Sequence, residues 1–408
     1  MLKQTDNCMD YLKILCEKSP DRRVGSEGNI AATSFFKEVL ISNGWEIKST
    51  EFDAVDWYDG GAALRCGDRE FEVLASPYSN GCDVEGELVA VGTLHELETG
   101  DFRDKILMLH GELAQEQLMP KNFVFYNPEE HRRIISLLEQ SGVKAIVCAT
   151  DRNASLAGGV YPFPLIEDGD FDIPSVYMTE EEGAKLRSCS GKTVLLTSDS
   201  QRIPGVGYNV IGVKNPGASR RIVISAHIDS KKGSPGAIDN ATGVAVMLLL
   251  SDLLSNYEGE YTLELVAFNG EDYYAVPGQM VYLKENSYKF DDVLLNINID
   301  GAGYREGKSA FSLFKLPETV QHAVTHVFET HEGIVEGVPW YQGDHGIFLQ
   351  YGVPAIAVSS KWFIDNVDTQ EITHTPKDNL SIVNYDRIVE IAVAIDDLIR
   401  SLTSKENH

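Results

Sequence analysis

The chain has 408 residues, and its 35 Lys and Arg against 62 Asp and Glu give a net charge of −27. This acidity excludes nucleic acid and anionic membrane surfaces as main partners, because both are bound by clustered cations. Hydrophobic residues form 43% of the chain, so it can build cores, and the length favours two or three domains. The longest apolar run, near 244–250, is too short to span a bilayer.

The first fifteen residues contain acidic side chains and no apolar segment, so we expect no signal peptide. All six cysteines lie before residue 190 without a CxxC spacing. This pattern favours buried free thiols over zinc fingers or a disulfide scaffold. We therefore expect a cytoplasmic protein, in which a metal site in the C-terminal half uses His, Asp and Glu.

Residues 4–18 have apolar side chains at helical spacing, which predicts a first helix. A second amphipathic helix should begin at Ser26 and end at Asn43-Gly44, and a strand is expected over 45–57. Between 77 and 202, short β-branched runs (87–91, 106–110, 145–149) accompany one helix, 129–142. From about residue 205, apolar runs alternate with helices. The expected strands there are 209–213, 222–226, 262–268, 294–299, 311–314 and 355–358, and the helices are 240–256, 318–331 and 385–402.

Such runs, buried on both faces and separated by helices, indicate an α/β fold with a mixed, mostly parallel sheet flanked by helices. The change in the pattern of apolar runs and helices along the sequence predicts a discontinuous core domain, 1–76 with 203–408. It also predicts a smaller β-rich inserted domain over 77–202.

Polar side chains that can bind metals follow the apolar runs of this core. His227 and Asp229 follow one run, Glu271-Asp272 another and Asp300 a third, while Asp239 lies in a glycine-bounded loop before a helix. The crevice beyond the carboxyl ends of parallel strands is where open α/β sheets bind ligands, so these residues should meet there. His374, in a loop before the last helix, completes the set.

Imidazole and carboxylate together suit zinc, although another divalent transition metal is also compatible. Two ions need a bridging carboxylate, for which Asp239 is the candidate. Each residue alone has a structural interpretation, such as a cap, a turn or a solvated loop. The order and the strand-end positions of the whole set favour metal binding.

The motifs His227-x-Asp229, Gly236-Ala-Ile-Asp239-Asn240, Glu271-Asp272, Asp300-Gly301 and His374-Thr-Pro-Lys-Asp378 resemble those of the di-zinc exopeptidases of metallopeptidase family 28. This group includes aminopeptidase S, aminopeptidase Y and glutamate carboxypeptidase II. The resemblance implies the zinc exopeptidase (phosphorylase/hydrolase-like) fold. The insert is similar, more weakly, to a protease-associated domain.

The resemblance also implies roles. One ion is held by His227 and Asp300, the other by Asp272 and His374, and Asp239 bridges them. Glu271 is the general base, and Asp229 orients the His227 imidazole. Three features depart from the family pattern: Asp272 where Glu is usual, 273–279 in place of Gly-Ser, and Thr373 where many members have Tyr.

We therefore expect an aminopeptidase that hydrolyses N-terminal residues from peptides by a metal-bridged water. A carboxypeptidase would need a cation for the terminal carboxylate, for which Arg305 is the candidate, and Asp344 and His345 should line the pocket. A single-zinc acyltransferase like the glutaminyl cyclases and a non-catalytic binding protein are the alternatives. The insert is a possible surface for a homo-oligomer.

Overall fold

The computed structural model describes residues 2–403, apart from the side chains of Ala154 and Leu156. The chain divides into two compact units, Met1–Ala54 with Val206–His408, and Val55–Gly205. The predicted insert, 77–202, lies within the second unit, and its likeness to a protease-associated domain stays a prediction.

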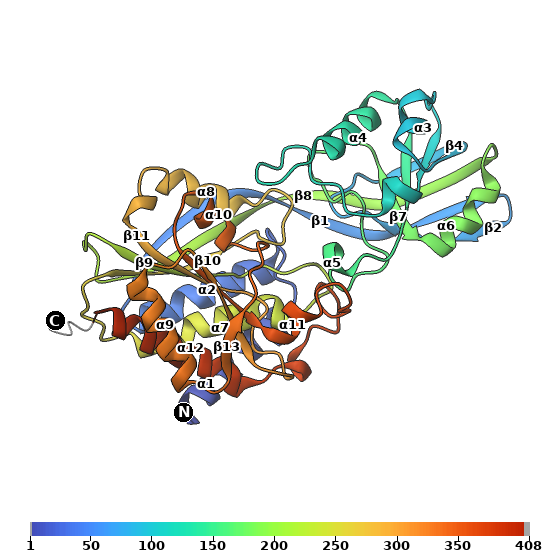
Figure 1. Ribbon diagram of the computed structural model, residues 1–408. Helices are drawn as coiled ribbons and strands as arrows, with labels where there is room; N and C mark the ends of the chain where they lie inside the picture. The colour runs from blue at the N-terminus through green and yellow to red at the C-terminus, as the bar shows by residue number, and fades with distance from the viewer. Residues whose placement is uncertain (1, 404–408) are drawn as a thin grey trace. The chain divides into compact units, whose positions relative to one another are not determined.

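The first unit is built on a mixed sheet with four parallel strands at its centre (Figure 1). The strand order is β13-β12-β14-β11-β9-β10-β8, in which β14, β11, β9 and β10 are parallel neighbours. Strand β12 runs antiparallel to β14 and parallel to β13, and β8 runs antiparallel to β10. The predicted mixed, mostly parallel sheet is thus confirmed. The strands are β8 (Thr193–Lys214), β9 (Arg221–His227), β10 (Thr262–Phe268), β11 (Val293–Ile299), β12 (Ser309–Phe314), β13 (Ile334–Gly337) and β14 (Ala355–Ser360).

Helix α7 (Thr242–Leu253) lies against this sheet and forms the middle of the core. Its residues 242–251 are all buried, and it contacts β9, β10 and β11 as well as α1, α2 and α12. A helix that is apolar on all sides is stable only when it is enclosed in this way. The other helices of the unit are α1 (Leu2–Lys13), α2 (Glu27–Ser42), α8 (Pro277–Asn286), α9 (Glu318–Thr330), α10 (His345–Gln350), α11 (Lys361–Asp365) and α12 (Tyr385–Thr403).

The second unit contains four neighbouring parallel strands, β4-β5-β6-β7, with β3 and the first part of β8 antiparallel at the two sides. Its strands are β1 (Glu46–Cys66), β2 (Arg69–Phe71), β3 (Leu74–Ala75), β4 (Cys82–Val91), β5 (Ile106–Leu109), β6 (Ala145–Thr150) and β7 (Ser175–Thr179). Its helices are α3 (Leu94–Thr99), α4 (Glu129–Gln140), α5 (Ala154–Ala157) and α6 (Glu180–Leu186).

Strand β1 extends to Cys66, well past the predicted end at residue 57, and in doing so passes from the first unit into the second. Within residues 2–403, no helix combines the length and the apolar character that a bilayer span requires.

Candidate metal centre

The site forms where three adjacent parallel strands end. His227 is the last residue of β9, Glu271 and Asp272 follow β10, and Asp300 follows β11. Strand β9 pairs in parallel with β10 on one side and with β11 on the other, and His227 is in register with Phe268. Because the strands run in the same direction, their polar extensions lie along one edge of the sheet.

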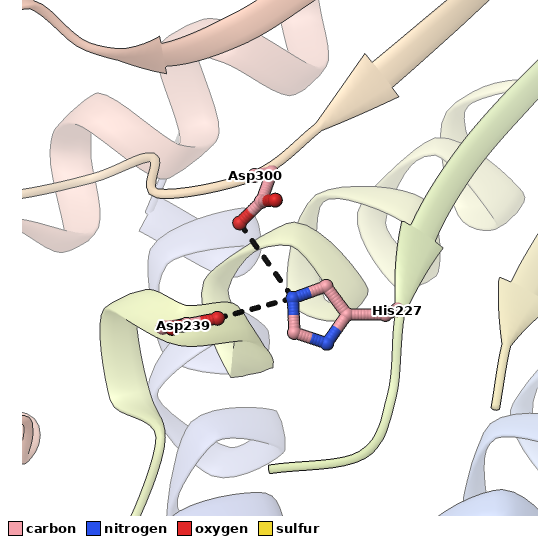
Figure 2. Close-up of side chains that lie close together, drawn as sticks. All are labelled: His227, Asp239 and Asp300. Carbon is pink, nitrogen blue, oxygen red and sulfur yellow. Dashed lines mark ion pairs between the residues drawn. The ribbon is translucent and has the colours of Figure 1, made fainter. Parts of the chain in front are cut away.

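The first group of candidate ligands consists of His227, Asp239 and Asp300 (Figure 2). The Nε2 atom of His227 lies 3.0 Å from Oδ1 of Asp239 and 3.6 Å from Oδ1 of Asp300. Figure 2 shows both carboxylates pointing at the same edge of the imidazole ring. Two acids and an imidazole that converge in this way can hold one metal ion.

The second group consists of Asp239, Asp272 and His374. The Nε2 atom of His374 lies 3.1 Å from Oδ2 of Asp239 and 3.1 Å from Oδ1 of Asp272. Asp239 therefore directs one carboxylate oxygen to each imidazole. His374 has a φ of 64°, a strained conformation for a residue other than glycine, and such strain is common at functional sites.

The chemistry of these side chains fits a divalent cation. The Nε2 atom of His227 and the Oδ2 atom of Asp272 are buried and have no hydrogen-bond partner, although buried polar atoms are normally paired. Burial by itself lowers the pKa of His227, but the surrounding carboxylates raise it well above its usual value. The same balance of burial and carboxylates raises the pKa of His374. The acids thus favour positive charge here, which a metal ion supplies while both imidazoles stay neutral ligands.

Two further buried carboxylates hold the backbone that presents these side chains. Asp229 accepts hydrogen bonds from the backbone N–H groups of Gly270 (2.8 Å), Glu271 (3.2 Å) and Asp272 (3.0 Å). Its distance to Nδ1 of His227 is 3.7 Å, which is too long for a hydrogen bond. Asp229 therefore acts mainly on the loop of Glu271 and Asp272 and contacts the imidazole only weakly.

Asp378 has the corresponding role for the Asp239 loop. Its two oxygens accept from the N–H groups of Ile238 (2.7 Å) and Asp239 (3.0 Å). Burial raises the pKa of the Asp378 carboxyl to about 7, with the charge of Asp239 adding to the effect. The carboxylate of Asp378 thus fixes the backbone of the residue that both ligand groups share.

Arg22 supports the site in a way that sequence reasoning missed. Its side chain is 0% exposed and donates hydrogen bonds to four backbone carbonyls in three parts of the chain. The acceptors are Leu15 (2.8 Å), Ile228 (3.0 Å), Pro235 (2.8 Å) and Gly236 (2.8 Å). Arg22 thereby joins the segment after His227 to the start of the Asp239 loop.

The three residues expected to contact substrate, Asp344, His345 and Arg305, have different surroundings in the structure. Asp344 is buried, accepts from Nε2 of Gln279 at 2.7 Å, and has one oxygen without a hydrogen-bond partner. Burial raises its pKa to about 7. His345 is 0% exposed and packs between the rings of Trp340 and Phe314, so it supports the loop from inside.

Arg305, the third of these residues, belongs to neither ligand group. Its side chain is 54% exposed and lies 3.8 Å from the carboxylate of Glu306. Thr373, which stands where many family members have Tyr, has its hydroxyl 2.6 Å from the amide nitrogen of Gln370. The hydroxyl of Thr373 therefore already accepts a hydrogen bond from Gln370.

Residues 209–399 match the sequence model described as Peptidase family M28. The chain is 23% identical to aminopeptidase YwaD of Bacillus subtilis over 66% of its own length, and it spans only 59% of that relative.

Solved structures of similar fold include two aminopeptidases. The aminopeptidase from Aneurinibacillus sp. strain AM-1 has a TM-score of 0.76 and 21% identity, with 99% of this chain and 96% of that chain covered. A zinc aminopeptidase from Bacillus subtilis, BSAP, has a TM-score of 0.75 and 18% identity, with 98% and 95% covered.

Proposed function

We propose that the chain, whose residues 209–399 match the model of Peptidase family M28, is a zinc-dependent aminopeptidase. The observation that carries the proposal is the position of Asp239, which offers one oxygen to each of two imidazoles, His227 and His374. A carboxylate in this position suits two ions that share it. The similar fold of BSAP, a zinc aminopeptidase from Bacillus subtilis, supports the choice of metal.

We assign His227 and Asp300 to one ion, Asp272 and His374 to the other, and Asp239 to both. Zinc bound there supplies a Lewis acid that polarises a peptide carbonyl and makes a coordinated water more acidic. Two divalent ions would also balance the four carboxylates of Asp239, Glu271, Asp272 and Asp300, which would be costly to bury without cations.

Glu271 is the proposed general base. Burial, followed by the neighbouring acids, raises its pKa well above the usual value, so its carboxylate has a high affinity for a proton. The bonds from its own N–H and from Asp272 N–H to Asp229 fix the backbone from which it projects. Glu271 can then accept a proton from the attacking water and pass it to the leaving amine.

The charges around the site favour the amino end of a peptide over its carboxyl end. The ion pairs among the ligand residues all join imidazole to carboxylate, and Arg305, the candidate cation for a terminal carboxylate, is largely exposed. Asp344 adds a buried acid with an unpartnered oxygen near Asp300. A substrate ammonium group suits these surroundings better than a substrate carboxylate does.

The test combines elemental metal analysis with a panel of matched peptides. We expect two zinc ions per chain and cleavage of peptides with a free N-terminus, whereas N-acetylated peptides should stay intact and C-terminal amidation should have little effect. One ion per chain, with cyclisation of N-terminal glutamine, would support the cyclase-like alternative. A protein that binds peptides without hydrolysis at any metal loading would support a binding function.

A further inference from the structure

One buried amide side chain, Gln370, organises the loop that carries the candidate ligand His374. The loop lies between α11 and α12, and its residues 372–375 form a turn in which the N–H of Thr375 donates to the carbonyl of Ile372 at 3.3 Å. His374 is the third residue of this turn and has a φ of 64°. A positive φ at the third position is a feature of type II turns, where Gly or Asn is favoured. The turn therefore holds His374 in a conformation that its own Cβ disfavours.

The side chain of Gln370 makes three hydrogen bonds to this turn, and the residue is 6% exposed. Its Oε1 atom accepts from the backbone N–H groups of Ile372 at 2.8 Å and Thr373 at 3.1 Å. Its Nε2 atom donates to the hydroxyl of Thr373 at 2.6 Å. One amide thus fixes both residues that precede His374. Because a strained backbone persists only where the surrounding contacts determine it, these bonds account for the conformation of His374.

The chain on the other side of His374 leads directly to the second candidate ligand loop. The hydroxyl of Thr375 donates at 2.7 Å to the same carbonyl that closes the turn, and it accepts from the N–H of Lys377 at 3.2 Å. Asp378 follows, and its carboxylate holds the backbone of the Asp239 loop. The segment 370–378 therefore fixes the His374 turn at one end and the Asp239 loop at the other.

We propose that Gln370 is a positioning residue for the second group of candidate ligands, and this inference rests on the proposed function. Its hydrogen bonds hold His374 where the Nε2 atom lies 3.1 Å from the carboxylates of both Asp239 and Asp272. Without Gln370, the turn relaxes toward a negative φ at His374, which moves the imidazole away from the two acids. The first group takes its imidazole from His227, at the end of β9, so its zinc affinity does not depend on this turn.

Three substitutions separate the contributions of the amide oxygen and the amide nitrogen. Gln370→Met keeps the length of the side chain and removes all three hydrogen bonds. Gln370→Glu keeps an oxygen that accepts from both backbone N–H groups, and the Thr373 hydroxyl can rotate to donate to the new carboxylate. Thr373→Val removes only the bond to Nε2 of Gln370. A matched control in the second unit is Gln117→Met, which removes a single bond of 2.8 Å to Glu167.

Zinc binding to the full-length chain, measured against buffered free zinc, tests the proposal. Asp272→Ala identifies the binding step that belongs to the second group. Gln370→Met should lower the affinity in that step by about 10- to 100-fold, the usual range for residues that support a metal ligand, and leave the other step unchanged. Thr373→Val should lower it less, and Gln370→Glu should bind zinc there at least as tightly as the wild type. Gln117→Met should leave both steps unchanged.

Hydrogen exchange of the metal-free protein gives a second readout. The backbone amides of Ile372 and Thr373 should exchange faster in Gln370→Met than in the wild type or Gln370→Glu, because they lose their acceptor. Unchanged exchange, an equal loss of affinity in both zinc steps, or a second step that Gln370→Met leaves intact would overturn the positioning role and leave the aminopeptidase proposal standing. A wild-type chain that binds no zinc would instead overturn the proposed function, and this inference with it.

Discussion

Replacing Asp229 with asparagine should weaken the second metal group, Asp239-Asp272-His374, more than the first. The sequence suggests that Asp229 orients His227, a ligand of the first group. In the structure, its oxygens accept instead from the N–H groups of residues 270–272, which carry Glu271 and Asp272. The two interpretations therefore predict different metal-binding defects for one isosteric substitution.

The size of the effect follows from the hydrogen bonds. Asparagine keeps one side-chain oxygen, which can still accept from Gly270 and Glu271, but it turns an NH₂ group toward the N–H of Asp272. A hydrogen bond to a charged acceptor contributes about 1.5–3 kcal/mol. Loss of one bond, with two donors left facing each other, should raise the free energy of the ordered loop by roughly 2–3 kcal/mol. Affinity for zinc at the second group should then fall about 30- to 150-fold.

The assay is bound zinc measured against buffered free zinc for the wild type and three variants. Asp272→Ala removes a ligand from the second group, and Asp300→Ala removes one from the first, so these two give reference curves. Asp229→Asn should weaken the same zinc-binding step that Asp272→Ala weakens, which is binding at the second group. A shift in the step that Asp300→Ala affects, or no shift at all, would refute the loop-holding role of Asp229.

Three other outcomes are expected. Glu271→Gln should keep its zinc but lose about 10²- to 10⁴-fold in kcat, as metal analysis and peptide hydrolysis would show, and full activity would exclude Glu271 as the base. Arg22→Met should destabilise the first unit by about 3–5 kcal/mol in urea unfolding, because four backbone carbonyls, three of them buried, lose a charged donor, and a change below about 1 kcal/mol would contradict this. In metal-free protein, the raised pKa values of His227 and His374 mean that their protonation stabilises the fold fully below about pH 6.5. That stability should be lost as the pH rises through the folded-state pKa values of the two histidines, and zinc affinity should increase over the same range. A Tm of the metal-free protein that rises with pH would contradict this prediction.

The residues that the structure brings together at the candidate metal centre could be predicted from the sequence because their signals are local. An apolar run that ends in His227 or precedes Asp300 indicates both the strand and the polar residue at its end. The supporting residues Asp378 and Arg22 carry no such signal. Asp378 reaches the N–H groups of residues 238 and 239, and Arg22 reaches carbonyls at 235 and 236, only after distant segments fold together. A lone Asp or Arg in a loop looks the same whether it is solvated or buried.

The errors in the predicted elements have a similar origin. Helix α8 was missed because its buried positions are Gly278, Gln279, Tyr282 and Asn286, so the inward face is largely polar and shows no apolar period. Strand β1 continues through Gly60-Gly61, although such a pair is typical of a turn. A Cβ on Gly60 would lie 2.3 Å from a carboxylate oxygen of Asp199, so this glycine permits close packing within a continuing strand.

The hydrogen-bond partners of the buried acids separate metal ligands from supporting residues, which residue type alone cannot do. Asp229 and Asp378 have both oxygens satisfied by backbone N–H groups, so their remaining capacity to bind an ion is small. Asp239 instead directs its two oxygens at imidazoles, and Asp272 keeps a buried oxygen without a partner. A carboxylate held by N–H donors fixes a loop, whereas one left without them needs a cation. By this criterion Asp344, with one oxygen bonded to Gln279 and the other unpartnered, lies between the two classes. An acid of that kind can support the site through one oxygen and offer the other to the ammonium group of a substrate.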